Sequence, residues 1–415
     1  MRPKLRPWQV AVYAGVLLYL AFEVARSVWR SEIVVFSGYV GLGEAVLAGR
    51  DPYSLGLNTW PPFFGLVAAA LALLTRALPL HVALALWQLG AVGAIWGCCR
   101  LLARCFEDGG DRLSFWPQAE GSPSFVSGAV LVPVLLSARI LQEHLQHTQV
   151  NLFLLFLILL AFVLFREKRP VSGGLALALA ASAKAMPVLI VGYLVYRRRW
   201  RDTAWTIGWL LVLNGVLLAL AFGPHETLDQ WQSWRAVAAR EIVAPATARG
   251  MNQSLLAVSY RLVAQPETAR ALFYGAAGLF ALGLALAFRG GGNELRSRRA
   301  AAEWAISLVA MTLVTPLAWK AHYVTLLSGY WCVWWGLRQL SPGTPGRRWR
   351  LGVLVASVLL VTLSAPAVVG KQTAAALESL NAIALGALLV VALGVSLLRR
   401  LPPLPPTSSA IRSAP

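Results

Sequence analysis

The chain has 415 residues, of which 58% are hydrophobic and 13% are charged, and its mean hydropathy is +0.63. A soluble domain is about 45–50% apolar and about 25% charged, so this composition excludes an ordinary soluble enzyme and predicts one integral membrane domain. The net charge of +19 would indicate nucleic-acid binding in a soluble protein. Here the basic residues cluster at the ends of apolar segments, where they set membrane orientation. We therefore expect membrane lipids, and no nucleic acid, as partners.

Roughly a dozen apolar segments follow one another along the chain. A spanning helix needs about 20 residues, so we expect an all-α polytopic membrane protein with about 11–13 transmembrane helices. The first segment is too long for the apolar core of a signal peptide and predicts a transmembrane helix. The segments are Trp8–Trp29, Pro61–Leu74, Val82–Leu102, Val126–Leu141, Val150–Phe165, Gly174–Tyr196, Ala204–Phe222, Ala271–Phe288, Trp304–Val314, Tyr323–Leu337, Leu351–Val369 and Ile383–Leu398.

Basic clusters predict which ends of these segments face the cytoplasm. The basic N-terminus is expected there, together with the C-terminus and with the clusters Arg166–Arg169, Arg197–Arg201, Arg296–Arg299, Arg347–Arg350 and Arg399–Arg400. These assignments agree with one another only if two segments do not cross. We therefore expect Pro61–Leu74 to lie along or dip into the outer face. We expect Gly174–Tyr196 to be a hairpin of two short helices, broken near Lys184 and Pro187 because proline disfavours helix at the preceding residue.

With this topology every polar-rich connection falls on the outer side of the membrane. These connections are Arg30–Trp60, His144–Asn151, the Lys184 tip, Pro224–Arg270 and Pro316–His322. A chemical site is therefore expected to be extracytoplasmic. We predict one transmembrane domain over residues 1–400, with outer loops at 30–60 and 223–270, in a bacterial plasma membrane. Residues 401–415 are rich in proline and serine and are predicted to be a disordered cytoplasmic tail.

The first outer loop carries carboxylates, which are scarce in this chain. Glu32, Glu44 and Asp51 lie in it, whereas the whole chain has only 18 acidic residues. A carboxylate at the lipid–water boundary can act as general base for a hydroxyl group. The alternative for each of them is a solvated loop acid, and Gly-Arg-Asp-Pro-Tyr, which ends at Tyr53, also fits a simple turn.

A second polar group precedes the apolar segment that starts at Val150. It contains His144, His147, Gln149 and Asn151. The amides of Gln149 and Asn151 suit sugar hydroxyls, since each offers donors and an acceptor; interfacial capping of the helix is the alternative. No metal site is expected, because zinc needs a third ligand that no spacing supplies. The four cysteines are interpreted as small apolar fillers.

Positive side chains lie on three other outer segments. Lys184 stands inside an apolar segment, where an ammonium is costly and by default functional and paired with an anion. Lys320 and His322 lie between two short helices. Arg261 follows a polar run that begins with Asn252; an N-cap with a snorkelling arginine is the alternative interpretation there.

Carboxylates on one loop and cations on three others, all on one face, suit a lipid-linked phosphosugar as substrate. The phosphate would be held by the cations, and a carboxylate would activate an acceptor hydroxyl. The sequence has no Walker loop and no Rossmann glycine fingerprint for a soluble nucleotide. It also has no Asp-x-Asp motif, so a metal-bound sugar nucleotide is not indicated, and we expect no cofactor.

At these residues the chain resembles the polyprenol-phosphate-mannose-dependent mannosyltransferases, glycosyltransferase family 87, of the GT-C superfamily. The order and spacing of the matching pieces carry the resemblance, more than any single piece. They are Gly49-Arg-Asp-Pro-Tyr53 with Trp60-Pro-Pro62, Gln149-Val-Asn151, Gly174 through Lys184 and Pro187 to Arg197-Arg-Arg-Trp-Arg201, Asn252-Gln-Ser254, and Pro316-Leu-Ala-Trp319 with His322.

The resemblance implies a GT-C fold with outer juxtamembrane helices. It implies transfer of a sugar, usually mannose, from a polyprenyl phosphate to a lipid or glycan acceptor with inversion. It also implies a catalytic aspartate in the first outer loop, where this chain has Glu32 instead. The glycine that usually precedes the Gln-x-Asn motif is absent as well; His147 and Thr148 stand there.

The expected roles follow from these residues. Glu32 is the first choice for the base and Asp51 the second, while Lys184 and His322 hold the donor phosphate, with Lys320 and Arg261 as further candidates. Sugar or acceptor contacts are assigned to Tyr53, Trp60, His147, Gln149, Asn151, Asn252 and Trp319.

Two other classes of protein remain as alternatives. The first is a transporter or flippase of lipid-linked sugars, which would use the same cations. Such a protein typically has a pseudo-repeat between its halves, and we find none in the sequence. The second is a non-catalytic assembly subunit, which would need no clustered acid and lysine.

Overall fold

The computed structural model describes residues 7–29, 34–54, 59–107, 110, 113, 124, 126–243 and 251–400. These residues form helices joined by short connections, and none of them belongs to a strand. The expected all-α polytopic membrane protein is therefore confirmed. Glu32, the first choice for the base, lies outside the described residues, as does the predicted tail at 401–415.

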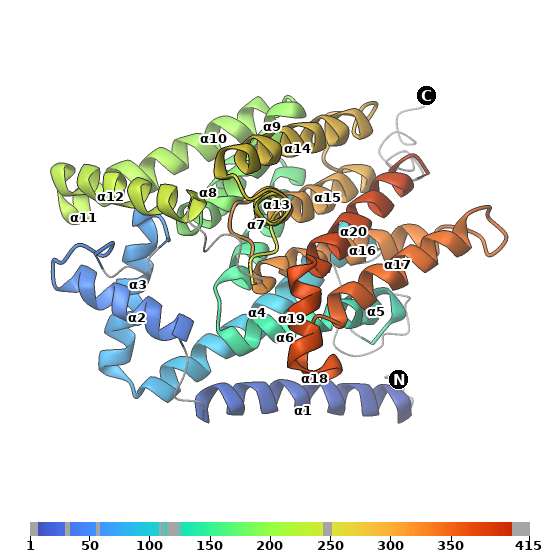
Figure 1. The fold of residues 1–415 in the computed structure, drawn as a ribbon, viewed down its shortest axis with the longest axis horizontal. Helices are drawn as coiled ribbons and strands as arrows, with labels where there is room; N and C mark the ends of the chain where they lie inside the picture. Colours follow the sequence, from blue (N-terminus) through green and yellow to red (C-terminus); the bar gives the residue numbers. More distant parts are fainter. Residues whose placement is uncertain are drawn as a thin grey trace, which may run out of the picture.

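The helices follow the apolar segments closely, with additional breaks (Figure 1). In chain order they are α1 (Pro7–Trp29), α2 (Val34–Leu47), α3 (Pro62–Ala77), α4 (Leu80–Phe106), α5 (Gly128–Leu136), α6 (Ala138–His147), α7 (Asn151–Arg166), α8 (Pro170–Ala183), η2 (Met186–Val188), α9 (Leu189–Tyr196), α10 (Trp200–Leu211), η3 (Val212–Val216), α11 (Leu217–Phe222), α12 (Pro224–Val243), α13 (Leu255–Leu262), α14 (Pro266–Ala287), α15 (Arg298–Val314), η5 (Lys320–Thr325), α16 (Leu326–Arg338), α17 (Arg347–Thr362), α18 (Pro366–Val369), α19 (Lys371–Ser379) and α20 (Ala382–Leu398).

Three described helices are long and apolar enough to cross a membrane on their own. They are α4, the continuous helix Trp200–Phe222 and α14. Two bent pairs, α5 with α6 at 60° and α19 with α20 at 56°, raise that number to as many as five. Most of the other apolar helices are shorter, and several are buried inside the protein. The number of 11–13 transmembrane helices expected from the sequence therefore stays a prediction.

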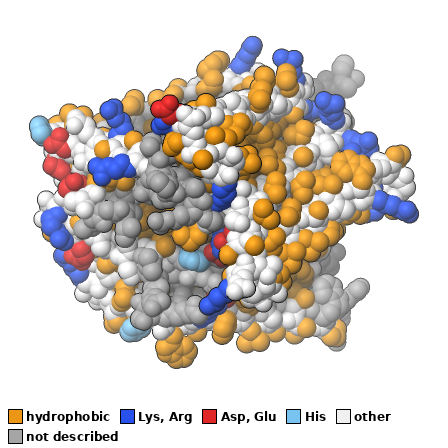
Figure 2. All heavy atoms as spheres, viewed as in Figure 1, with side chains coloured by type: hydrophobic (Ala, Val, Ile, Leu, Met, Phe, Trp, Pro, Cys, Tyr) orange, Lys and Arg blue, Asp and Glu red, His pale blue; other side chains and the backbone are white. Residues whose placement is uncertain are grey.

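The surface and the interior both fit a protein that sits in lipid. Figure 2 shows hydrophobic side chains over much of one face, with Lys and Arg side chains mainly toward its edges. Inside, α15 and α16 bury Trp304, Trp331 and Trp335 almost completely. The Trp304 ring packs 5.0 Å from that of Phe162 on α7. A helix that is apolar on all sides belongs in such an interior or in lipid.

The segment α8–η2–α9 folds back on itself, and we call it the re-entrant hairpin (residues 170–197). Its tip, Lys184, contacts Asn151 at the start of α7. At the other end of α7, Arg166 contacts the backbone oxygen of Arg296, and the hairpin ends at Arg197, which contacts Glu303 on α15. Both feet of the hairpin therefore lie at one end of the bundle and its tip at the other. The break falls where the sequence predicts it.

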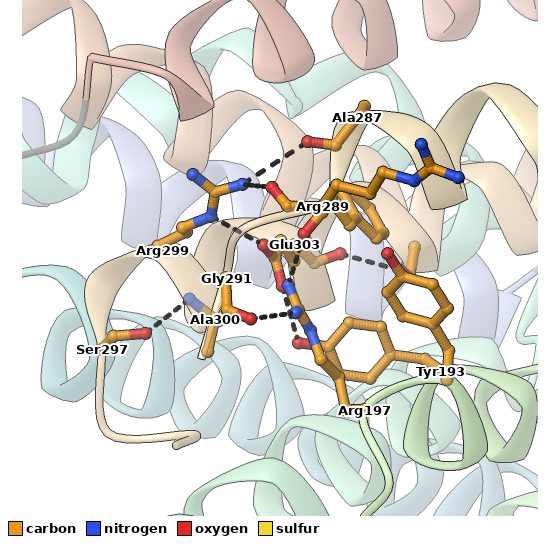
Figure 3. Close-up of polar contacts among 12 residues, drawn as sticks. Tyr193, Arg197, Ala287, Arg289, Gly291, Ser297, Arg299, Ala300 and Glu303 are labelled. Carbon is orange, nitrogen blue, oxygen red and sulfur yellow. Dashed lines mark hydrogen bonds and ion pairs between the residues drawn. The ribbon is translucent and has the colours of Figure 1, made fainter. Parts of the chain in front are cut away.

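A buried charge network holds the second foot of the hairpin (Figure 3). Arg197 pairs with Glu303 and also donates to the backbone oxygen of Gly291, at 2.6 Å. Tyr193 donates to the same carboxylate at 3.1 Å, and Arg299 pairs with it at 3.0 Å. The Glu303 side chain is 0% exposed. Removing one partner of such a pair leaves an uncompensated buried charge, so this network fixes α9 against α15.

The expected topology can be tested by labelling single cysteines in intact cells with a membrane-impermeant maleimide. Cysteines at Lys168 and at Arg199, next to the two feet of the hairpin, are expected to stay unlabelled until the cells are opened. The four native cysteines are buried and give a low background. His225→Cys is the positive control, because its side chain is 93% exposed and it belongs to the predicted second outer loop. Labelling of position 168 or 199 from outside would overturn the topology.

Candidate functional site

The tip of the re-entrant hairpin brings three polar side chains from distant segments together. Lys184 Nζ lies 2.9 Å from Asn151 Oδ1 and 2.6 Å from His322 Nε2. Asn151 and His322 are buried, whereas Lys184 is half-buried. We call these three residues the Lys184 cluster. The structure thus joins three residues that the sequence assigned to the donor phosphate and the sugar.

The contacts of His322 fix how the Lys184 cluster holds its protons. An ammonium has only donors, so Lys184 donates to Nε2 of a neutral imidazole. On the other side of the ring, Nδ1 lies 3.0 Å from the backbone oxygen of Leu317 and 3.2 Å from the backbone nitrogen of Trp319. Lys184 has a third N–H, and among the described residues no carboxylate forms an ion pair with it. Within the described part of the chain, the ammonium form of Lys184 therefore has no carboxylate partner.

The turn that carries Gln149 and Asn151 is tied to the helices around it. Thr148 ends α6 in the left-handed region, at φ 51°, and its backbone oxygen accepts from the Trp87 indole at 3.0 Å. The backbone N–H of Val150 donates to the Tyr39 hydroxyl at 3.2 Å. The turn is therefore held by α2 and α4, so that Asn151 begins α7 at a fixed place beside Lys184.

Asn252 is used to build the loop before His322. Its Nδ2 donates to the backbone oxygen of Pro316 at 3.0 Å, and its Oδ1 accepts from the backbone N–H groups of Ser254 and Ala318, both at 3.1 Å. Asn252 also forms an isolated antiparallel bridge with Trp319. The side chain that the sequence assigned to sugar binding thus holds protein backbone here.

Lys320 and Arg261 have partners of their own. Lys320 Nζ lies 2.5 Å from Glu378 Oε1 and 4.0 Å from Glu143 Oε1. Arg261 donates to Asn381 Oδ1 and, at 2.7 Å, to the backbone oxygen of Asn252. The Lys320–Glu378 pair attaches α19 to η5, and the Arg261–Asn381 contact attaches the start of α20 to α13. The structure therefore joins Lys184 and His322, but places Lys320 and Arg261 in other interactions.

A cavity of about 430 Å³ lies next to the Lys184 cluster. Its wall contains four side chains singled out in the sequence: His147, Gln149, Trp319 and Lys320. The other lining residues were not predicted from the sequence; they are Arg26, Arg139, Gln142, Glu143, Gln146, Met251, Ala321, Ala365, Pro366 and Ala367.

The sequence contains a helical pattern that could have identified several of these cavity residues. Positions 139, 142, 143, 146 and 147 follow helical spacing and form one polar face of α6. The predicted segment Val126–Leu141 hid this face, because it joined the start of α6 to α5. In the structure the helix is broken at Ser137, with Pro133 inside α5.

Among the described residues of the first loop, aromatic contacts link Tyr53 and Trp60 to the site. Asp51 is exposed, and its Oδ1 accepts from the backbone N–H of Tyr53 at 2.9 Å in a local turn. The Tyr53 hydroxyl donates to the backbone oxygen of Trp60 at 3.0 Å. Burial, aided by the nearby Asp51 carboxylate, raises the pKa of Tyr53, so the phenol stays a donor. The Trp60 ring lies 4.9 Å from that of Tyr39, which binds Val150.

Within the described residues, no group of three or more His, Cys, Asp or Glu side chains is placed to hold a metal ion. A search of curated proteins and a search of solved structures each found no match. The model of glycosyltransferase family 87 matches residues 58–317, which is more than half of the chain and includes Asn151 and Lys184. This polytopic membrane protein belongs to glycosyltransferase family 87.

Proposed function

We propose that the protein transfers a sugar, with mannose as the expected one, from a polyprenyl phosphate to a lipid or glycan acceptor. The observation that carries the proposal is the Lys184 cluster: the lysine at the tip of the hairpin, which we expect at membrane depth, has no carboxylate partner among the described residues. A charged group at such a position is costly unless it is paired. The phosphate of a lipid-linked donor supplies the missing anion and arrives from within the bilayer.

The proposed reaction is a direct displacement at the anomeric carbon. The acceptor oxygen attacks that carbon from the face opposite the phosphate, a new carbon–oxygen bond forms, and the bond to the phosphate oxygen breaks. The acceptor proton passes to a carboxylate, and the polyprenyl phosphate leaves as an anion. Lys184 would stabilise the charge that grows on the leaving oxygen, and His322 Nε2 would hold the ammonium in place. The displacement inverts the configuration of the sugar.

For the base we propose Glu32, with Asp51 as the second choice. Glu32 immediately follows the end of α1 in the chain, at the position where the family has its aspartate. Asp51 is on an exposed turn in which one oxygen is already engaged. The proposed location of the site is the extracytoplasmic face of a bacterial plasma membrane, with a role in building the cell envelope.

The test is reconstitution of the purified protein in proteoliposomes with a radiolabelled polyprenyl phosphomannose and extracted membrane lipids. Transfer of label to a lipid or glycan product, with polyprenyl phosphate released, is the expected result. Movement of the intact labelled donor across the bilayer without any product would favour the transporter class instead. A product formed from polyprenyl phosphoglucose but not from the mannose donor would keep the reaction and change the sugar.

A further inference from the structure

The cavity beside the Lys184 cluster is balanced in charge, and the cluster is not. Each cation in the cavity wall has a carboxylate partner: Arg139 with Glu143 at 2.6 Å, Lys320 with Glu378 at 2.5 Å, and Arg26 with Glu23 at 3.6 Å. The Arg139 and Glu143 side chains are only 7% and 10% exposed. An acidic ligand in this cavity would therefore find no unpaired positive charge, and it would lose its hydration.

The remaining polar groups of the wall suit hydroxyl groups. Gln142, Gln146 and Gln149 present side-chain amides, which both donate and accept. The Gln142 amide forms no hydrogen bond with the described residues, so it is available to a ligand. Trp319 is 44% exposed and adds an aromatic surface. The volume of about 430 Å³ lies within the usual range for small-molecule sites, roughly 300–1,000 Å³.

Asn151 links the cavity to the Lys184 cluster. Its Oδ1 accepts from Lys184 at 2.9 Å. On the other side its Nδ2 donates to Gln149 Oε1 at 2.7 Å and to the backbone oxygen of Ala321 at 3.1 Å, and both of those residues line the cavity. A group bound in the cavity and a phosphate bound to Lys184 would thus be separated by one side chain.

We propose that this cavity binds the acceptor, and that the acceptor end which enters it is an uncharged saccharide. The proposal rests on the proposed function. The Gln142 amide and the less tightly held oxygen of Glu143, Oε1, bind hydroxyl groups of the acceptor, while the Trp319 indole packs against a sugar ring. The balanced charges disfavour acceptors that carry a carboxylate or phosphate on the sugar.

The experiment offers reconstituted protein four acceptors with the same alkyl chain: octyl mannoside, octyl glucoside, octyl glucuronide and a phosphorylated octyl glucoside. Transfer to the two neutral glycosides is expected, with at least about tenfold lower use of the two acidic ones, which corresponds to about 1.4 kcal/mol. Equal or better use of the acidic glycosides would overturn the inference while the proposed function stands. If the labelled donor is not consumed with any acceptor, including extracted lipids, the proposed function itself fails.

Two variants at Gln142 test the cavity at a position whose side chain forms no hydrogen bond with the described residues. Gln142→Ala is expected to raise the KM for the neutral acceptor about tenfold, the cost of one or two hydrogen bonds, with the KM for the donor unchanged. Gln142→Lys adds an unpaired charge and is expected to improve use of octyl glucuronide relative to octyl glucoside. Gln372→Ala, at an exposed glutamine on α19, is the control. Unchanged acceptor KM and unchanged selectivity in both Gln142 variants would overturn the assignment.

Discussion

Lys184→Ala is expected to abolish sugar transfer while the protein stays folded in the membrane. The ammonium is the only group of the Lys184 cluster that carries a full charge, since His322 accepts from it as a neutral imidazole. Loss of one preorganised donor to a developing negative charge typically costs about 10²–10³-fold in kcat. Removal of the full charge is expected to cost at least this much. The measurement is the rate of product formation in proteoliposomes.

The controls for Lys184 separate charge from structure. Lys371→Ala removes an exposed lysine on α19 and is expected to leave the rate unchanged. Lys184→Met keeps the length of the side chain and is expected to be as inactive as the alanine variant. Equal melting temperatures in detergent would show that folding is retained. A fully active Lys184→Ala protein would show the lysine to be incidental and would remove the main support for the proposed donor site.

Glu32→Gln is expected to lower turnover by at least about 100-fold with donor binding retained, because a positioned general base contributes about 10²–10⁴-fold. The amide keeps the shape of the side chain and removes its basicity. Glu32→Asp is expected to keep measurable activity, since aspartate is the residue that the family resemblance implies at this position. The measurement is kcat under donor saturation, together with the affinity for the donor.

The variant Asp51→Asn separates the two candidates in the first loop. If Glu32→Gln turns over normally and Asp51→Asn is inactive, the loop is correct and the base is Asp51. Normal turnover in both variants would contradict the proposed displacement with a loop carboxylate. The transporter class would then become the better explanation.

Much of the fold could be predicted, because a helix that crosses a bilayer must be apolar over about 20 residues and is therefore visible in the sequence. Apolar length and basic ends were enough to place most of the apolar helices and to predict the break in the re-entrant hairpin, where Lys184 and Pro187 interrupt an otherwise continuous apolar segment. They did not place α2, α12 and α13, which lie in stretches predicted as outer loops. The bend between α5 and α6 was missed although Pro133 signals it. The α18–α19 segment was missed because Leu351–Val369 reads as one apolar run, whereas the structure ends α17 at Thr362.

The sequence predicts a site residue only where the type of residue is unusual for its position in the chain. Lys184 and His322 stood out as cations beside apolar helices, and the structure joins them. The cavity did not stand out, because its wall is assembled from α1, α6, the loop before η5, and α18. The pairing of Lys320 with Glu378 is a contact across separate elements that no local pattern encodes. Asn252 is the opposite case. The sequence predicted that its amide binds sugar, whereas in the structure the amide binds backbone groups of the protein.

The contacts of the re-entrant hairpin also constrain the order in which the protein is assembled. Arg197 finds its partner Glu303 only 106 residues later in the chain, and Lys184 finds His322 138 residues later. During synthesis from the N-terminus, Arg197 lacks Glu303 until α15 has been made, and Lys184 has Asn151 but lacks His322 until η5 has been made. A lysine with incomplete pairing is costly if it lies at membrane depth in that interval. We therefore expect a ribosome-bound chain truncated before residue 303 to keep the hairpin accessible to protease, and the full-length chain to protect it.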